Sequence, residues 1–106
     1  MDLHRLAEER SVAYHSVIAE RILRQPEVLE KARQRVQSWL ASGTPFYALK
    51  WAEILARDPA SIAAFLVERS ELADELRQSS PFAGALNPRE RWKIMRETRE
   101  QFEQRQ

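Results

Sequence analysis

Hydrophobic residues along this chain recur mainly at the spacing of α-helices. Residues 26–41 show the pattern most clearly, because their apolar positions form one stripe and every charged residue lies outside it. Alternating runs of β-branched or aromatic residues bounded by turns, which would indicate strands, are absent. The pattern predicts an all-α fold with helices near residues 2–24, 26–41, 45–57, 59–68, 70–78 and 88–104.

Proline marks the start of four of these helices. The four pairs are Gln25-Pro26, Thr44-Pro45, Asp58-Pro59 and Asn87-Pro88. Proline suits the first helical position because the N–H that it lacks would have no partner there. Thr44, Asp58 and Asn87 are residue types that cap a helix, and Asn87 forms a capping box with Glu90. Gly43 is expected to end the preceding helix in the left-handed conformation.

Residues 45–67 are apolar around nearly the whole circumference of both helices that they contain. A helix of this kind belongs in the interior of a bundle. We therefore expect residues 1–106 to form a single helical domain, a compact bundle of five to six helices around a buried central hub at 45–67.

The connector at residues 79–86 is unusual, because Phe82 and Leu86 are poor choices for a solvated loop. Pro81 disfavours helix at the residue before it, and Gly84 is costly within a helix. The favoured interpretation is that the loop crosses the core with Phe82 as its anchor, and that Gly84 supplies either a positive φ or close approach. The alternative is a loop that binds a partner protein.

Both terminal helices place arginines on apolar stripes. Arg10 and Arg21 lie near the centre of the stripe of the first helix, and Arg91 and Arg99 share a face with Trp92 in the last. A buried guanidinium without a partner costs several kcal/mol. These arginines either extend their heads to water or pair within the chain, or the terminal helices dock on another molecule, since interfaces combine aromatic residues with arginine.

Composition excludes several classes of function. The 106 residues include no cysteine, which rules out thiol catalysis, thiolate metal sites and redox switching. Seventeen basic and sixteen acidic residues give a net charge of +1, too balanced to indicate nucleic acid or membrane. Charged residues interrupt the apolar region 46–67 and fill the N-terminus, so we expect no membrane span, no secretion signal and a cytoplasmic location.

Signals for catalysis or metal binding are weak. His4 and Glu8 have the spacing of a metal-binding pair, but His15 lies eleven residues from His4, roughly 16 Å along a helix, so it cannot join them. Ser79 and Ser80 have no His or Lys near them in sequence to activate a hydroxyl. We expect no enzyme, no cofactor and no metal.

Nucleic-acid binding has somewhat more support. The last helix is rich in arginine and lysine, and Trp92 could stack on a base. Glutamates interleave with these cations, however, and the pairs Lys93–Glu97 and Arg96–Glu100 have the spacing of ion pairs on a solvent-exposed face. Residues 59–78 could form a helix-turn-helix, but its second helix is acidic and would repel phosphates.

Three stretches together carry a family resemblance. They are "LHRLAEERSVAYH", "YALKWAEIL" and "LRQSSPFAGALNPRERWKIMRE". With them the chain resembles small all-helical bacterial proteins of unassigned or antitoxin type, encoded beside a toxin gene. The resemblance implies a cytoplasmic protein that neutralises an enzyme by contact through an amphipathic helix or loop and represses its own operon. The chain departs from two-part antitoxins, since it has no evident DNA-binding half followed by a disordered tail.

We therefore expect a non-catalytic protein–protein interaction module, antitoxin-like or adaptor, that binds and regulates a partner protein such as a toxin enzyme. Its contact surface would comprise the terminal helices and the 80–86 loop. The alternatives are a small helical nucleic-acid-binding transcriptional regulator and an obligate homodimer. The expected contact residues are Arg10, Tyr14, Arg21, Phe82, Arg91, Trp92 and Arg99.

Overall fold

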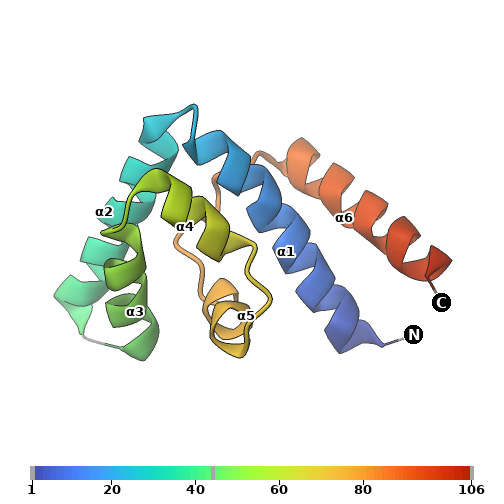
Figure 1. Cartoon of the computed structure of the whole chain (residues 1–106), viewed down its shortest axis with the longest axis horizontal. Helices are drawn as coiled ribbons and strands as arrows, with labels where there is room; N and C mark the ends of the chain where they lie inside the picture. The colour runs from blue at the N-terminus through green and yellow to red at the C-terminus, as the bar shows by residue number, and fades with distance from the viewer. Residues whose placement is uncertain (1, 44, 106) are drawn as a thin grey trace.

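A computed structural model describes residues 2–43 and 45–105, which form six α-helices and no strand (Figure 1). The chain is therefore all-α, as the hydrophobic pattern predicted. The helices are α1 (Leu3–Ile22), α2 (Pro26–Ser42), α3 (Phe46–Leu55), α4 (Pro59–Leu66), α5 (Glu71–Arg77) and α6 (Pro88–Gln104).

Side-chain caps begin most of these helices. The Asp58 carboxylate accepts a hydrogen bond from the backbone N–H of the third residue of α4, and Ser70 caps α5 in the same way. Asn87 and Glu90 form the predicted capping box at the start of α6. Thr44, the expected cap of α3, lies outside the described residues. The predicted starts of α4 and α6 are thus confirmed together with their caps, and α5 begins close to its predicted start.

The two glycines of the chain differ in conformation. Gly43 has φ 158° and ψ −176°, which is extended backbone, so the prediction of a left-handed cap after α2 is wrong. Gly84 has φ 83°, and a Cβ placed there would meet nothing within 4 Å. The loop therefore needs Gly84 for its positive φ and not for close approach.

Helix α1 packs against every other described helix except α3. It contacts α2, α4, α5 and α6, and its buried side chains include Leu6, Ile18 and Ile22. Helix α6 runs antiparallel beside α1 and, among the described helices, packs against α1 alone (Figure 1). The main cluster of buried core residues contains none from α6.

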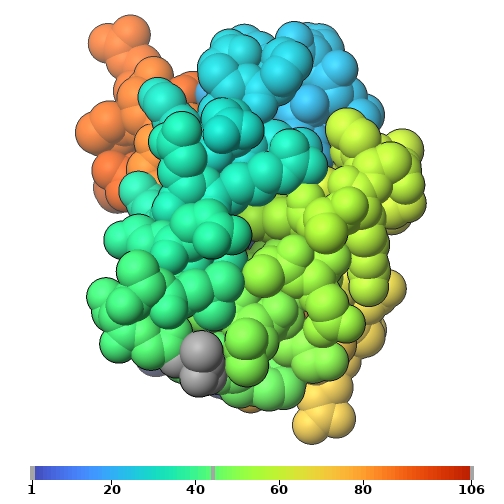
Figure 2. Space-filling view, turned by 90° about the vertical axis from the view of Figure 1, so that its left-hand side faces the viewer, coloured from blue at the N-terminus to red at the C-terminus, as the bar shows by residue number. Residues whose placement is uncertain are grey.

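Residues 45–67 supply much of the core but are not buried on every side. Trp51 and Ile62 are fully buried, and the Trp51 indole N–H donates to the Leu76 carbonyl at 3.1 Å. Helix α3 lies beside α2, with α4 next to it (Figure 2). Phe46 and Leu49 remain 52% and 48% exposed. Because α3 contacts α2, α4 and α5 but neither terminal helix, the expectation that it is buried all round is wrong for one of its faces.

The loop that follows α5 crosses the core. Phe82 is 1% exposed, and its ring lies edge-on to Trp51, with centroids 6.2 Å apart. The Tyr14 hydroxyl donates to the Phe82 carbonyl at 2.7 Å, which fixes the loop to α1. The predicted role of Phe82 as a core anchor is confirmed, and its ring is too buried to contact a partner protein.

Replacing Asn87 by alanine should loosen the start of α6. The Asn87 side chain accepts from the Glu90 N–H at 2.8 Å, and Glu90 accepts from the Asn87 N–H at 3.1 Å. Loss of such a cap typically costs about 1 kcal/mol. We expect a drop of that size in the free energy of unfolding, with faster hydrogen exchange at the Glu90 amide. Unchanged exchange at that amide would contradict the assigned cap.

Candidate interaction groove

An open groove of about 660 Å³ lies where the two terminal helices face the rest of the bundle. Its walls come from α1, α6, the end of α5, the loop at 78–84, and single residues of α2 and α3. Five large apolar or aromatic side chains line it, and three arginines are its only formally charged residues. These side chains are Tyr14, Trp39, Tyr47, Ile94 and Met95, and Arg10, Arg77 and Arg91.

The aromatic wall is built by residues that are distant in sequence. Trp39 lies in the last turns of α2 and Tyr47 in the first turn of α3, and their rings meet edge-on with centroids 5.3 Å apart. Tyr14 of α1 stands edge-on to the His15 ring, also with centroids 5.3 Å apart. Edge-to-face pairs of this kind fix ring positions as well as burying area. The groove therefore has an ordered aromatic lining.

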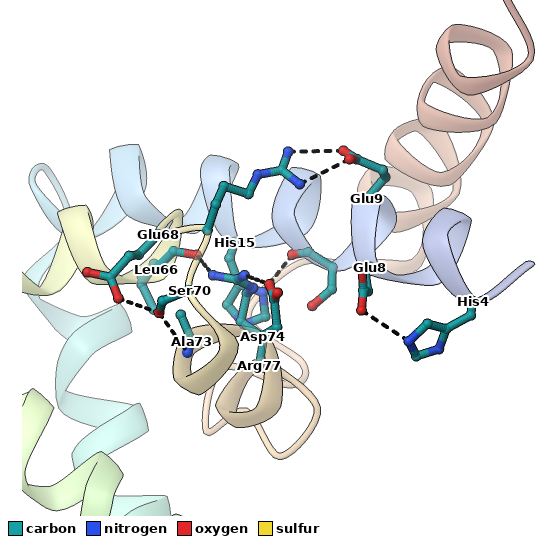
Figure 3. A network of polar contacts seen from close by, with 12 residues as sticks. His4, Glu8, Glu9, His15, Leu66, Glu68, Ser70, Ala73, Asp74 and Arg77 are labelled. Atoms are coloured by element: carbon teal, nitrogen blue, oxygen red, sulfur yellow. Dashed lines mark hydrogen bonds and ion pairs between the residues drawn. The ribbon is translucent and has the colours of Figure 1, made fainter. Parts of the chain in front are cut away.

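Arg77 is neutralised within the fold. Its side chain is 1% exposed and donates to the Leu66 carbonyl at 3.2 Å and to the Asp74 carboxylate (Figure 3). A buried guanidinium with a carboxylate and a carbonyl as partners is the arrangement that burial requires. Arg77 therefore joins the end of α4 to α5 and leaves little charge for a ligand.

Arg10 and Arg91 have no such partners. Among the described residues, neither side chain makes a hydrogen bond or an ion pair, and Arg10 Nε is buried without an acceptor. No aspartate or glutamate lines the groove to offset them. The groove is therefore positively charged, with one unpaired guanidinium from α1 and one from α6.

A histidine and a serine meet in the groove although they lie far apart in sequence. His15 Nδ1–H donates to the Ser11 carbonyl at 2.7 Å, which leaves Nε2 to accept the Ser80 hydroxyl at 2.8 Å. Ser80 Oγ in turn accepts from the Phe82 N–H at 3.1 Å. The proximity resembles a nucleophile with its base. Each of these groups is already hydrogen-bonded within the fold, so we interpret the pair as a clamp that holds the loop on α1.

Burial sets the charge state of this histidine. The pKa of His15 is lowered from 6.5 to about 4, mainly by its removal from water and to a smaller extent by the nearby Arg77 charge. The hydrogen bond to the Ser11 carbonyl opposes both effects. His15 is therefore neutral at pH 7, as its acceptor role toward Ser80 requires.

The structure gathers only part of the expected contact set into the groove. Arg10, Tyr14 and Arg91 line it, whereas Phe82 lies in the core. Trp92 is 64% exposed on α6 outside the groove. Arg21 and Arg99 also lie outside the groove, and both form ion pairs.

The two arginines that form ion pairs make different kinds of contact, one between two helices and one within a single helix. Arg21 of α1 forms an ion pair with Glu90 of α6 at 2.5 Å, with both side chains partly buried. This contact raises the pKa of Arg21 and lowers that of Glu90. Arg99 pairs with Glu103 on its own helix at 3.1 Å. Arg21 thus fastens the start of α6 to α1, while Arg99 makes a local contact on the surface.

The first half of α6 carries more unpaired cations than expected. The pairs Lys93–Glu97 and Arg96–Glu100 are not formed, and Arg89 also has no ion pair among the described residues. The spacing of these residues permits the two pairs, but exposed pairs gain little free energy to offset side-chain ordering. This part of α6 therefore presents free positive charge.

Residues suited to metal binding do not converge. His4 Nε2 lies 3.1 Å from Glu8 Oε1, the two being one helical turn apart on α1. Within residues 2–43 and 45–105, no group of three His, Asp or Glu side chains is placed to hold an ion.

Across the same residues, no helix combines the length and the apolar character needed to span a bilayer.

Sequence reasoning missed most of the groove. The sequence did not indicate that Trp39, Tyr47 and the His15–Ser80 pair would lie at one site, because they come from separate helices and a loop.

Comparison with protein-family models, with curated proteins and with solved structures gave no match.

Proposed function

We propose that this chain is a non-catalytic protein–protein interaction module, antitoxin-like or adaptor, that binds and regulates a partner protein in the cytoplasm. The contact surface is the first half of α6, with the groove beside it. We define the α6 face as Arg91, Trp92 and Met95.

One observation carries this proposal: the first half of α6 is amphipathic but has no buried residue. Trp92 and Met95 are 64% and 40% exposed, whereas the buried residues of α6 are Thr98 and Phe102 in its second half. Among the helices that the structure describes, α6 contacts α1 and no other. Exposed tryptophan and methionine beside an unpaired arginine match the composition of interface centres. A partner protein would bury what the fold leaves exposed.

Two arginines on the same helix provide a matched test. Arg91→Ala removes an unpaired charge from the α6 face, and Arg99→Ala removes an exposed arginine that pairs with Glu103. We expect Arg91→Ala to weaken binding of the partner by at least about tenfold, and Trp92→Ala by a similar factor. Arg99→Ala should change binding by less than about twofold.

The measurement begins with a tagged pull-down from the native host at physiological salt, with nuclease added. The retained protein is then purified and titrated against the wild-type chain and the three variants. An enzyme whose activity falls on binding would favour the antitoxin-like form of the proposal. Equal binding by Arg91→Ala and Arg99→Ala, or retention only when nuclease is omitted, would contradict it, and the second result would favour a nucleic-acid-binding regulator.

A further inference from the structure

The size of the groove suits a ligand much smaller than a protein. Its volume of about 660 Å³ lies within the range of roughly 300–1,000 Å³ that is typical of pockets for small organic molecules. Tyr14, Trp39 and Tyr47 contribute aromatic rings from three helices, and Ile94 and Met95 contribute apolar surface from α6. Such walls bind the flat or aliphatic body of a ligand by removing its apolar surface from water.

Most polar groups of the groove are already engaged within the fold. The Tyr14 hydroxyl donates to the Phe82 carbonyl, and His15 exchanges hydrogen bonds with Ser11 and Ser80. Arg77 is held by Asp74 and by a backbone carbonyl. Within the part of the chain that the structure describes, the charged groups of the groove that lack a partner are the guanidinium groups of Arg10 and Arg91.

These two guanidinium groups determine the charge of a suitable ligand. No carboxylate lines the groove, so a cation would be repelled, whereas an anion would meet two unpaired arginines. Carboxylate and sulfonate oxygens accept charge-assisted hydrogen bonds from arginine, often two at a time. Within the described residues no acceptor offsets the Arg10 charge, and its Nε atom is buried without a hydrogen-bond partner.

We infer that the groove is a binding site for a free small organic anion, a carboxylate or sulfonate attached to an aromatic or aliphatic body. Arg10 and Arg91 bind the anionic group, and the rings of Tyr14, Trp39 and Tyr47 bind the body. This inference goes beyond the proposed function, because it requires no partner protein.

Anilinonaphthalene sulfonate is a suitable probe, because it combines two aromatic units with one anionic group. Titration of the intact chain at neutral pH should give saturable fluorescence with one dye per chain, and the total tryptophan emission should fall as the dye fills the groove beside Trp39. The neutral parent compound, anilinonaphthalene, should bind about tenfold more weakly or worse, because it lacks the group that pairs with arginine. Equal binding of the two compounds, or no saturable signal, would overturn the inference.

Substitutions locate the dye. Arg10→Ala and Arg91→Ala should each weaken dye binding by about tenfold. Arg99→Ala and Trp92→Ala should leave it within about twofold, because neither residue lines the groove. Because Arg91 is exposed at the open groove, Arg91→Ala should leave the fold intact, so it remains informative even if Arg10→Ala lowers the melting temperature. Dye binding that neither Arg10→Ala nor Arg91→Ala weakens would overturn the inference.

The dye titration and the partner titration can fail separately. Trp92→Ala should weaken partner binding and spare the dye, whereas Arg10 is tested here with the dye alone. Absence of saturable dye binding removes the ligand site and leaves the pull-down result standing. Absence of a partner removes the proposed function and leaves the dye result standing.

Discussion

Replacing Phe82 by alanine is expected to lower the free energy of unfolding by about 3–5 kcal/mol, the usual cost of deleting a buried phenyl ring. Phe82 is 1% exposed and packs edge-on against Trp51 and His15, with ring centroids 6.2 Å and 6.5 Å away. Removing the ring leaves a cavity where the loop crosses the core. Such a loss is a large share of the total stability of a domain of this size, roughly 5–15 kcal/mol.

Chemical denaturation of the variant and of Ala83→Ser measures this cost. Ala83 is the exposed neighbour of Phe82, so its substitution should change stability by no more than about 0.5 kcal/mol. A Phe82→Ala loss below about 1 kcal/mol would show that the ring does not anchor the loop. The contrast separates loss of core packing from a general effect of changing the loop.

Acidification should destabilise the protein through His15 before the carboxylates contribute. The folded state keeps His15 neutral with a pKa near 4, whereas the unfolded chain takes up the proton near pH 6.5. Between these values the unfolded state binds more protons, so stability falls as pH falls. From about pH 7.5 to about pH 5 the expected loss is about 2 kcal/mol, since one pKa unit corresponds to about 1.4 kcal/mol. Below pH 4 both states are protonated and this loss stops growing.

The variant His15→Gln isolates this contribution, because glutamine offers both a donor and an acceptor and does not titrate. Its stability should be nearly independent of pH over the same range, although lower overall if the amide fits the site poorly. Glu9, Asp58 and Glu90 have pKa values lowered by their hydrogen bonds, so the stability that they contribute is lost only at lower pH. A wild-type slope equal to that of His15→Gln would contradict a buried neutral histidine.

The helices were predictable because their signals are local. A cap such as Asp58 or Asn87 acts on an amide three residues ahead, and a proline at the first helical position acts on its own turn. The role of Phe82 could also be predicted, because an aromatic ring between Pro81 and Gly84 has few places to go other than the core. These features depend on a few neighbouring residues.

The groove could not be predicted in the same way, because it depends on pairs that are distant in sequence. His15 and Ser80 are 65 residues apart, and Arg21 and Glu90 are 69 apart. Nothing in the pattern around Ser80 indicates which histidine will face it. Periodicity also could not show that α3 keeps Phe46 exposed, because that depends on which helices reach α3.

The attachment of α6 makes one wall of the groove separable from the core. Helix α6 is held through the Arg21–Glu90 pair at its start and the buried Phe102 near its end. Its Ile94 packs against the central core cluster, whose buried residues lie in the other helices and the loop. A change in the tilt of α6 would widen or narrow the groove at Arg91 and Met95 without exposing Trp51. The shape of the groove therefore depends largely on how α6 sits on α1, whereas the stability of the fold rests mainly on the core formed by the other helices and the loop.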